Sequence, residues 1–179
     1  PKIFNIIDNL KPSWRNELEI TDALQILLSE NNKISYHIIT DYWKDTGTPE
    51  DIINANRAIL ENKTNYFYGE KSDSVSLTGI VLIGKGTKIL GDSQIIGPVI
   101  VGENCILDNV CIGPNCSIGN NSQITNSNIQ NSIVMSDCII NTPIKIRNSI
   151  ISSNSEIEFK NNLQDEKIFL LGEGTKILL

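Results

Sequence analysis

Large aliphatic side chains recur at every sixth position through much of the second half of the chain. The series begins with Leu77, Ile83, Ile89, Ile95, Val101 and Leu107. After Leu107 the interval shortens once to five residues, and the series resumes as Ile112, Ile118 and Ile124. A six-residue period is typical of a solenoid of short strands, in which each coil can bury its apolar face only by stacking on its neighbours. The pattern therefore predicts a β-helix.

Two other positions of the repeat follow rules of their own. Four residues after each aliphatic stands a small or β-branched residue: Val81, Thr87, Ser93, Val99, Cys105, Cys111, Cys116 and Ser122. Three residues after it stand residues that tolerate a left-handed backbone, namely Gly86, Asp92, Asn104, Asn115 and Asn121, with Pro98 and Val110 as exceptions. We therefore expect a triangular coil with flat strands and tight corners. The hexapeptide pattern resembles that of known left-handed β-helices, which gives the hand.

The repeat weakens beyond Ile124 but keeps its spacing. The pairs six residues apart are Val134 with Ile140, Ile140 with Ile146, Ile133 with Ile139, Ile144 with Ile150, and Ile151 with Ile157. Residues 160–179 lack the repeat, and we expect them to cap the open end of the stack, because an uncapped end exposes core and strand edges. The predicted fold class is mainly β: a left-handed parallel β-helix preceded by a partial α/β segment.

The first sixty residues follow helical and strand patterns instead. Asp22 and Gln25 have the spacing of a capping box ahead of an apolar helical face at residues 23–28. Residues 34–41 are β-rich and predict a strand. A second helix is expected after Thr48, which can cap it, with Pro49 at its first position. Ile3 to Leu10 is a candidate for a further helix.

One strand and two or three helices cannot bury both faces of an α/β sheet, so this part is expected to be incomplete. The predicted division is an α/β remnant at 1–63, a linker at 64–76, the β-helix at 77–159 and a cap at 160–179. Because the chain begins with Pro1 and its first residues already have the character of a domain interior, we expect a fragment of a longer protein.

The net charge of the chain limits the kinds of partner that it is expected to bind. The formal net charge is −6 and the isoelectric point about 4.8, which opposes binding to nucleic acid or to an anionic membrane surface. The sequence has neither a signal-peptide pattern nor an apolar run long enough to span a bilayer. We therefore expect a cytoplasmic protein with no nucleic-acid or membrane partner.

Several residues invite a catalytic or metal-binding interpretation. The cysteines Cys105, Cys111, Cys116 and Cys138 lack the close pairs of a zinc site and fall in the small position of the repeat, so buried structural thiols are expected. His37, the single histidine, lies on the predicted strand and is expected to be structural. The strings GKGT at 84–87 and GEGT at 172–175 lack the features of a phosphate loop and predict turns.

Four strings carry a resemblance to a known family: PSWRNELEITDAL at 12–24, YWKDTGTPEDIINANRAIL at 42–60, GPVIVGENC at 97–105 and IRNSIISSNSEIE at 146–158. Together they resemble the carboxyl-terminal half of a glucose-1-phosphate thymidylyltransferase of the long type, within the sugar-phosphate nucleotidyltransferases. Such enzymes join a sugar 1-phosphate to a nucleoside triphosphate and release pyrophosphate, with magnesium bridging phosphate oxygens.

The resemblance implies roles for two residues. The family string W-x-D-T-G-T matches residues 43–48, so Asp45 would be one of two carboxylates that hold Mg²⁺, and Trp43 would line the sugar pocket. Spacing alone favours Asp45 as a turn residue before a helix. Asp22 is explained by helix capping, and Glu19 receives no firm role. The glycine-rich loop and the partner aspartate of the family would lie upstream of Pro1, so this chain is expected to be inactive by itself.

Two further hypotheses accompany this one. A coenzyme A-dependent acyltransferase fits the β-helix, but the coils contain no histidine to act as a base. The β-helix could also serve as an oligomerisation scaffold or in regulation, a role compatible with the first hypothesis. Binding of acetyl-coenzyme A and light scattering would discriminate them.

Overall fold

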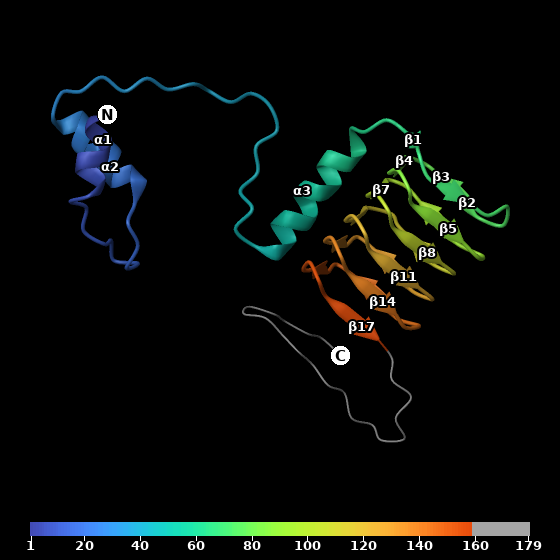
Figure 1. Ribbon diagram of the computed structural model, residues 1–179. Coiled ribbons are helices and arrows are strands. Elements are labelled where there is room, and N and C mark those ends of the chain that lie inside the picture. Colours follow the sequence, from blue (N-terminus) through green and yellow to red (C-terminus); the bar gives the residue numbers. More distant parts are fainter. Residues whose placement is uncertain (159–179) are drawn as a thin grey trace, which may run out of the picture. The chain divides into compact units, whose positions relative to one another are not determined.

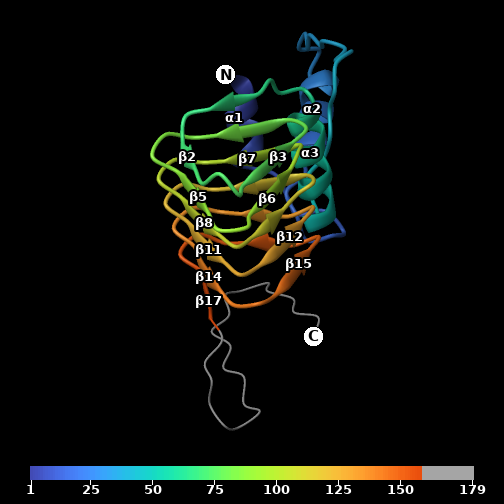
Figure 2. The ribbon, with the colours of Figure 1, turned by 90° about the vertical axis from the view of Figure 1, so that its right-hand side faces the viewer.

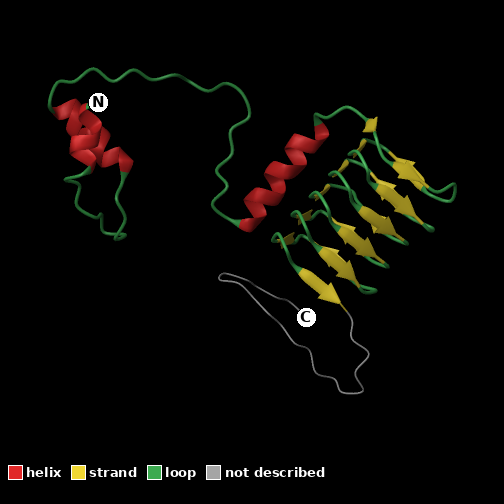
Figure 3. Cartoon of the chain, viewed as in Figure 1, coloured by secondary structure: helices red, strands yellow, loops and turns green. Residues whose placement is uncertain are grey.

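Short parallel strands are stacked in three sheets in the described chain, which comprises residues 1–158 of the computed structural model (Figure 3). The first sheet contains β1 (Tyr66–Phe67), β4 (Val81–Ile83), β7 (Val99–Val101), β10 (Cys116–Ile118), β13 (Ile133–Val134) and β16 (Ile150–Ile151). The second contains β2 (Glu70–Lys71), β5 (Lys88–Leu90), β8 (Ile106–Asp108), β11 (Gln123–Thr125), β14 (Ile139–Asn141) and β17 (Glu156–Glu158). The third contains β3 (Ser76–Thr78), β6 (Gln94–Ile96), β9 (Cys111–Ile112), β12 (Asn128–Gln130) and β15 (Lys145–Arg147).

Each coil takes one strand from each sheet, so coil 1 is β1–β3, coil 2 is β4–β6, coil 3 is β7–β9, coil 4 is β10–β12 and coil 5 is β13–β15, while β16 and β17 begin a sixth. Figure 2 shows the coils stacked as a prism. The predicted left-handed parallel β-helix is confirmed. The first coil lies within residues 64–76 as well as beyond them, so strands begin before the first aliphatic of the hexapeptide series.

The aliphatics of the repeat form the core. Ile89, Leu107, Ile124 and Ile140 stack in register on the second sheet, and all four are fully buried. The five-residue step after Leu107 is confirmed, because Ile112 pairs with Ile95 of the coil before. Each such side chain contributes roughly 1.5–3 kcal/mol through burial. The core is therefore a continuous column along the prism.

Beyond Ile124 the repeat persists, but the interval between successive buried aliphatics shortens. Ile129 is fully buried and Val134 nearly so, which makes two consecutive five-residue steps after Ile124. The six-residue pair Ile133 and Ile139 points outward instead: Ile133 is half-buried and Ile139 is 38% exposed. The six-residue interval between Ile133 and Ile139 therefore does not connect two core residues.

The corners agree with the sequence at most positions. Gly86, Asn104, Asn115 and Asn121 all have positive φ, as predicted. The expectation for Asp92 is wrong, because the preceding Gly91 takes the left-handed conformation with φ of 60°. Val110 is an exception in the pattern for the same reason: the residue before it, Asn109, takes the left-handed conformation at that corner, with φ of 52°.

Shifting this corner by one residue also changes the small position next to it. Val110 is 2% exposed, whereas Cys111 is half-buried and lies on the outer face of β9. The expectation that Cys111 occupies the buried small position is therefore wrong, and Val110 occupies it. Cys105, Cys116 and Cys138 are fully buried as predicted.

One helix packs on the outer face of the first sheet. α3 (Pro49–Glu61) runs beside the coils in both views (Figures 1 and 2) and contacts β10. Its Ile53 and Leu60 are buried, and so is Leu82, the outward residue of β4. Two polar contacts fix the helix: the Ser117 hydroxyl donates to Asn56 Oδ1 at 2.6 Å, and Arg57 Nη2 donates to Asn131 Oδ1 at 3.1 Å.

Residues Pro1–Trp43 form a separate compact unit. It contains α1 (Lys2–Ile7), which overlaps the predicted helical segment Ile3 to Leu10, and α2 (Ile20–Ser29). α2 begins two residues before Asp22, which lies in its first turn and makes no capping hydrogen bond, so the capping-box expectation is wrong. The predicted strand at 34–41 is wrong as well: these residues are extended and exposed, because no described strand pairs with them.

Candidate functional site

The segment that leads into α3 is tied together by side chains. The Thr48 hydroxyl accepts a hydrogen bond of 3.2 Å from the backbone N–H of Asp51 and donates one of 2.6 Å to the Asp51 carboxylate. Pro49 occupies the first helical position, where its missing N–H costs nothing. The predicted helix start is therefore confirmed in its residues and in its cap.

A lysine from the same segment completes this cluster. Lys44 Nζ lies 2.7 Å from Asp51 Oδ1. Lys44, and after it Thr48, lowers the pKa of the Asp51 carboxyl below its usual value, because both stabilise the ionised form. Side chains on both sides of Asp45 in the sequence, Lys44 and Thr48, thus contact Asp51 in the first turn of α3.

Asp45 itself is exposed, within this segment and three residues before the cap. A Cβ added at Gly47 would lie 3.8 Å from Asp45 Oδ1, an ordinary van der Waals distance. A carboxylate oxygen suits Mg²⁺, which prefers oxygen ligands and keeps several waters beside one or two carboxylates. No cluster of three metal-binding side chains occurs within residues 1–158.

Trp43 belongs to the first unit and is 69% exposed. Its indole combines a large apolar face with a donor N–H, which suits the face and hydroxyls of a sugar ring. His37 is exposed in the extended segment before it, so the expectation of a strand histidine is wrong. The GKGT string forms the predicted turn, and its Thr87 hydroxyl donates to Gly102 O at 2.7 Å. The GEGT string lies outside the described residues.

Sequence reasoning missed a second polar cluster, in the loop before α2. The Glu19 carboxylate accepts hydrogen bonds from Arg15 Nη2 at 2.6 Å and from the Ser13 hydroxyl at 3.1 Å. Arg15 and then Ser13 lower the pKa of Glu19. The i,i+4 spacing of Arg15 and Glu19 was the signal that could have indicated this pair. Glu19 therefore orders the loop rather than capping the helix by its side chain.

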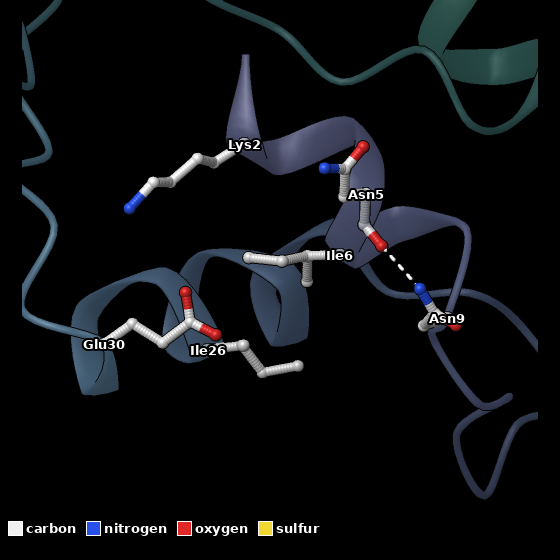
Figure 4. A pocket seen from close by; sticks show the side chains of 6 residues that line it. All are labelled: Lys2, Asn5, Ile6, Asn9, Ile26 and Glu30. Atoms are coloured by element: carbon white, nitrogen blue, oxygen red, sulfur yellow. Dashed lines mark hydrogen bonds between the residues drawn. The ribbon is translucent and has the colours of Figure 1, made fainter.

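The first unit also contains an open hollow between α1 and α2, shown in Figure 4. Its lining consists of Lys2, Asn5, Ile6, Asn9, Ile26 and Glu30. Asn9 Nδ2 donates to Asn5 O at 2.7 Å across one side. The hollow contains neither Trp43 nor Asp45, so it is separate from the residues singled out in the sequence.

The buried cysteines are expected to be unreactive as nucleophiles at neutral pH. Burial raises the pKa of the Cys116 thiol to about 11, and burial also raises the pKa of Cys105 and Cys138. A thiol with a raised pKa is a poor nucleophile at neutral pH, because the thiolate is the reactive form. These three cysteines are structural parts of the core.

Two family models match the chain in succession. Residues 1–62 match the nucleotidyl transferase model, and residues 95–178 match the GMPPB C-terminal domain model. The chain is 33% identical over 177 residues to a glucose-1-phosphate thymidylyltransferase from Streptomyces antibioticus, covering 99% of the chain and 49% of that protein. The chain belongs to the sugar-phosphate nucleotidyltransferase family, in the group with a carboxyl-terminal β-helix.

Other members of this family match shorter stretches. The low-salt glycan biosynthesis nucleotidyltransferase Agl11 of Haloferax volcanii is 48% identical over 79 residues, which is 44% of the chain and 22% of that protein. The bifunctional protein GlmU of Methanococcus aeolicus is 42% identical over 88 residues, 49% of the chain and 21% of that protein. The chain thus spans about half the length, or less, of these sugar-phosphate nucleotidyltransferase relatives.

The family match places the predicted site residues in the nucleotidyl transferase part, since both Trp43 and Asp45 lie within residues 1–62. The coils from β7 onward lie almost entirely in the second matched region. None of the helices within residues 1–158 has the length and apolar character that a membrane span requires.

Proposed function

We propose that this chain is the carboxyl-terminal part of a sugar-1-phosphate nucleotidyltransferase that converts glucose 1-phosphate and dTTP into dTDP-glucose and pyrophosphate in the cytoplasm. The observation that carries the proposal is the likeness to a glucose-1-phosphate thymidylyltransferase along 99% of the chain, with the two family models in the same order. The finer choice of glucose and thymidine rests on that relative and on a second glucose-1-phosphate thymidylyltransferase, from Streptomyces griseus, which is 36% identical over 100 residues.

In this proposal Asp45 supplies one carboxylate ligand to Mg²⁺. The surrounding contacts support the role, because Lys44 and Thr48, on either side of Asp45 in the sequence, both contact Asp51 in the first turn of α3. Bound magnesium would neutralise the negative charge of the phosphate groups while the sugar phosphate replaces pyrophosphate on the nucleotide. The chain's own contribution is to hold Asp45 before a capped helix, with no reorganisation needed at the moment of reaction.

Trp43 is proposed to contact the sugar. An exposed indole two residues before a metal-binding carboxylate can pack against the apolar face of a hexose while its N–H donates to a hydroxyl. Substitution of Trp43 by Phe should then raise KM for glucose 1-phosphate more than KM for dTTP.

The isolated chain is proposed to lack nucleotidyl transfer activity, because it covers only 49% of the length of its thymidylyltransferase relative. The test is a coupled pyrophosphate-release assay with glucose 1-phosphate, dTTP and Mg²⁺, run on the chain and on a longer protein that contains it. Release by the longer protein only is expected. Robust turnover by the chain alone would refute the fragment proposal, and no turnover by either with any nucleoside triphosphate would refute the function.

The β-helix is proposed to serve in homo-oligomerisation or regulation. Its outer faces carry exposed aliphatics such as Ile96 and Ile106, at 37% and 38%, which a second copy could cover. Light scattering on the chain tests this: a mass of two or more copies is expected, and a monomer at high concentration would contradict it.

A further inference from the structure

Asp45 belongs to the same compact unit as the coils. The boundary between the two units lies between Trp43 and Lys44, so Asp45 and α3 fall in the second unit. In sequence, however, both lie within residues 1–62, which match the nucleotidyl transferase model. The carboxylate on which the proposed function rests therefore shares a unit with the β-helix, and contacts between α3 and the coils can bear on its position.

Two side chains connect the Asp45 segment to the first turn of α3. Lys44 Nζ lies 2.7 Å from Asp51 Oδ1, and the Thr48 hydroxyl donates a hydrogen bond of 2.6 Å to the Asp51 carboxylate. An α-helix rises about 1.5 Å per residue, so Asp51 lies about 9 Å along the axis from Arg57. Because the turns between them are hydrogen-bonded, a shift of α3 on the coils would also move Asp51, to which the neighbours of Asp45 are bound.

The corner between the third and first sheets holds α3 by a relay of three side chains. Arg57 Nη2 donates to Asn131 Oδ1 at 3.1 Å, and Asn131 Nδ2 donates to Asn148 Oδ1 at 2.6 Å. Asn131 and Asn148 turn this corner in successive coils, with positive φ of 46° and 48°. The Asn131 carboxamide uses both its acceptor and a donor, so the next coil fixes its orientation toward Arg57.

The apolar and polar contacts of α3 constrain the helix differently. Ile53 and Leu60 lie seven residues apart, two turns along the helix, and are buried. Burial of such side chains is non-directional, so it holds the helix against the sheet but tolerates small shifts along it. Hydrogen bonds need defined distances and angles, and Asn56 and Arg57 make them to the sheet face and to the corner. The polar contacts therefore fix the register of α3 along the coils.

We propose that Arg57 and Asn131 are positioning residues for nucleotidyl transfer, which act by setting the register of α3 and through it the place of Asp45. The inference rests on the proposed function, and it gives the β-helix a part in the reaction that is separate from oligomerisation. Neither residue needs to touch the substrate. A displacement of about 1 Å caused by a substitution far from the reacting atoms can cost about a hundredfold in rate, so the loss of one hydrogen bond at the corner is measurable.

The test substitution is Asn131→Gly, because glycine takes a positive φ without strain and only the carboxamide is lost. Its matched control is Asn121→Gly, at the corner between the first and second sheets, where Asn121 Nδ2 donates to Asp137 Oδ1 at 3.0 Å. Both substitutions remove a corner carboxamide that is hydrogen-bonded to the next coil, whereas Asn131 also binds Arg57. The two variants should therefore lose similar amounts of stability and differ in activity.

The first readout is kinetic. In a longer protein that is active in pyrophosphate release, Asn131→Gly should lower kcat about tenfold or more with KM for dTTP nearly unchanged, and Asn121→Gly should leave kcat unchanged. In the Asp45→Asn background, Asn131→Gly should have little further effect, because two residues that act through one group are not additive. Equal kcat values for Asn131→Gly and Asn121→Gly would overturn the proposal, as would losses that multiply in the Asp45→Asn background.

The second readout does not depend on activity. In ¹⁵N spectra of the 179-residue chain, Asn131→Gly should shift the backbone amide signals of Lys44, Asp45 and Asp51, and Asn121→Gly should not. Unshifted signals in Asn131→Gly would overturn the proposal. Absence of turnover in the unsubstituted longer protein would refute the proposed function instead, and the spectra would still decide whether this corner positions the Asp45 segment.

Discussion

The Ser117 hydroxyl on β10 donates a 2.6 Å hydrogen bond to Asn56 Oδ1 on α3, across 61 residues of sequence. The Asn56 Nδ2 atom is buried and has no partner within the described residues. This contact, with Arg57 on Asn131, fixes α3 on the coils. α3 begins at Pro49, four residues after Asp45, so Asp45 lies next in sequence to a helix that is fixed on the coils.

Ser117→Ala should lower the free energy of unfolding by about 1–3 kcal/mol, because it leaves the Asn56 amide with both polar ends unpaired at a covered surface. Urea denaturation followed by circular dichroism measures the change. Ser76→Ala is the control: Ser76 lies exposed on β3, and its loss should change stability by about 0.5 kcal/mol or less. Equal effects of the two substitutions would contradict the role of Ser117.

Ile129→Ala should cost about 2–5 kcal/mol of stability, since Ile129 is fully buried in the core column and its truncation leaves a cavity. Ile139→Ala, the comparison with the same chemistry, should cost about 1 kcal/mol or less because Ile139 faces outward. Thermal or urea unfolding distinguishes the two. A larger loss for Ile139 than for Ile129 would mean that the register beyond Ile124 is wrong.

Stability should fall as pH rises above about 9. Burial raises the pKa of Cys116 to about 11, whereas an unfolded thiol ionises near 8.5–9. Between these values the unfolded chain has lost a proton that the folded chain keeps, so deprotonation favours unfolding. Over about two pH units this thiol accounts for roughly 3 kcal/mol.

The check is urea unfolding at pH 7, 9 and 10.5 for the wild-type chain and for Cys116→Ala, which keeps a small side chain in the same position. The wild-type chain should lose stability more steeply between pH 9 and 10.5. Parallel losses in the two proteins would assign the alkaline sensitivity to other groups.

The hexapeptide register made the coils predictable, because the step lengths, small residues and left-handed corners agreed at most positions up to Ile124, with the corners near Asp92 and Val110 as exceptions. The shortened steps could have been read as well. Asn109, Asn126, Asn131 and Asn148 all have positive φ, and each stands two residues after an inward aliphatic that opens a five-residue step. Asparagine two residues after the aliphatic, rather than three, was the missed signal, and it also explains why Val110 rather than Cys111 is buried.

The first unit was less predictable, since the strand expected at 34–41 has no pairing strand within the described residues. Ile34, Tyr36 and Ile38 have the composition of a strand, yet a strand forms only where another strand supplies hydrogen bonds. The start of α3 was predictable from local sequence, because Thr48 and Pro49 specify it without any tertiary contact. Asp45 and Trp43 could be singled out only through the family resemblance, because a turn residue and an exposed indole carry no distinctive spacing.

Asp45→Asn tests the central claim most directly. In a longer protein that contains this chain and is active in pyrophosphate release, the substitution removes a charged magnesium ligand without changing the size of the side chain. The expected result is a fall in kcat of about a hundredfold or more, with a raised Mg²⁺ requirement, since even outer-shell partners of a metal cost ten- to a hundredfold. Asp41→Asn, an exposed aspartate four residues earlier, should leave both unchanged. Unaltered turnover and magnesium dependence in Asp45→Asn would contradict the assignment.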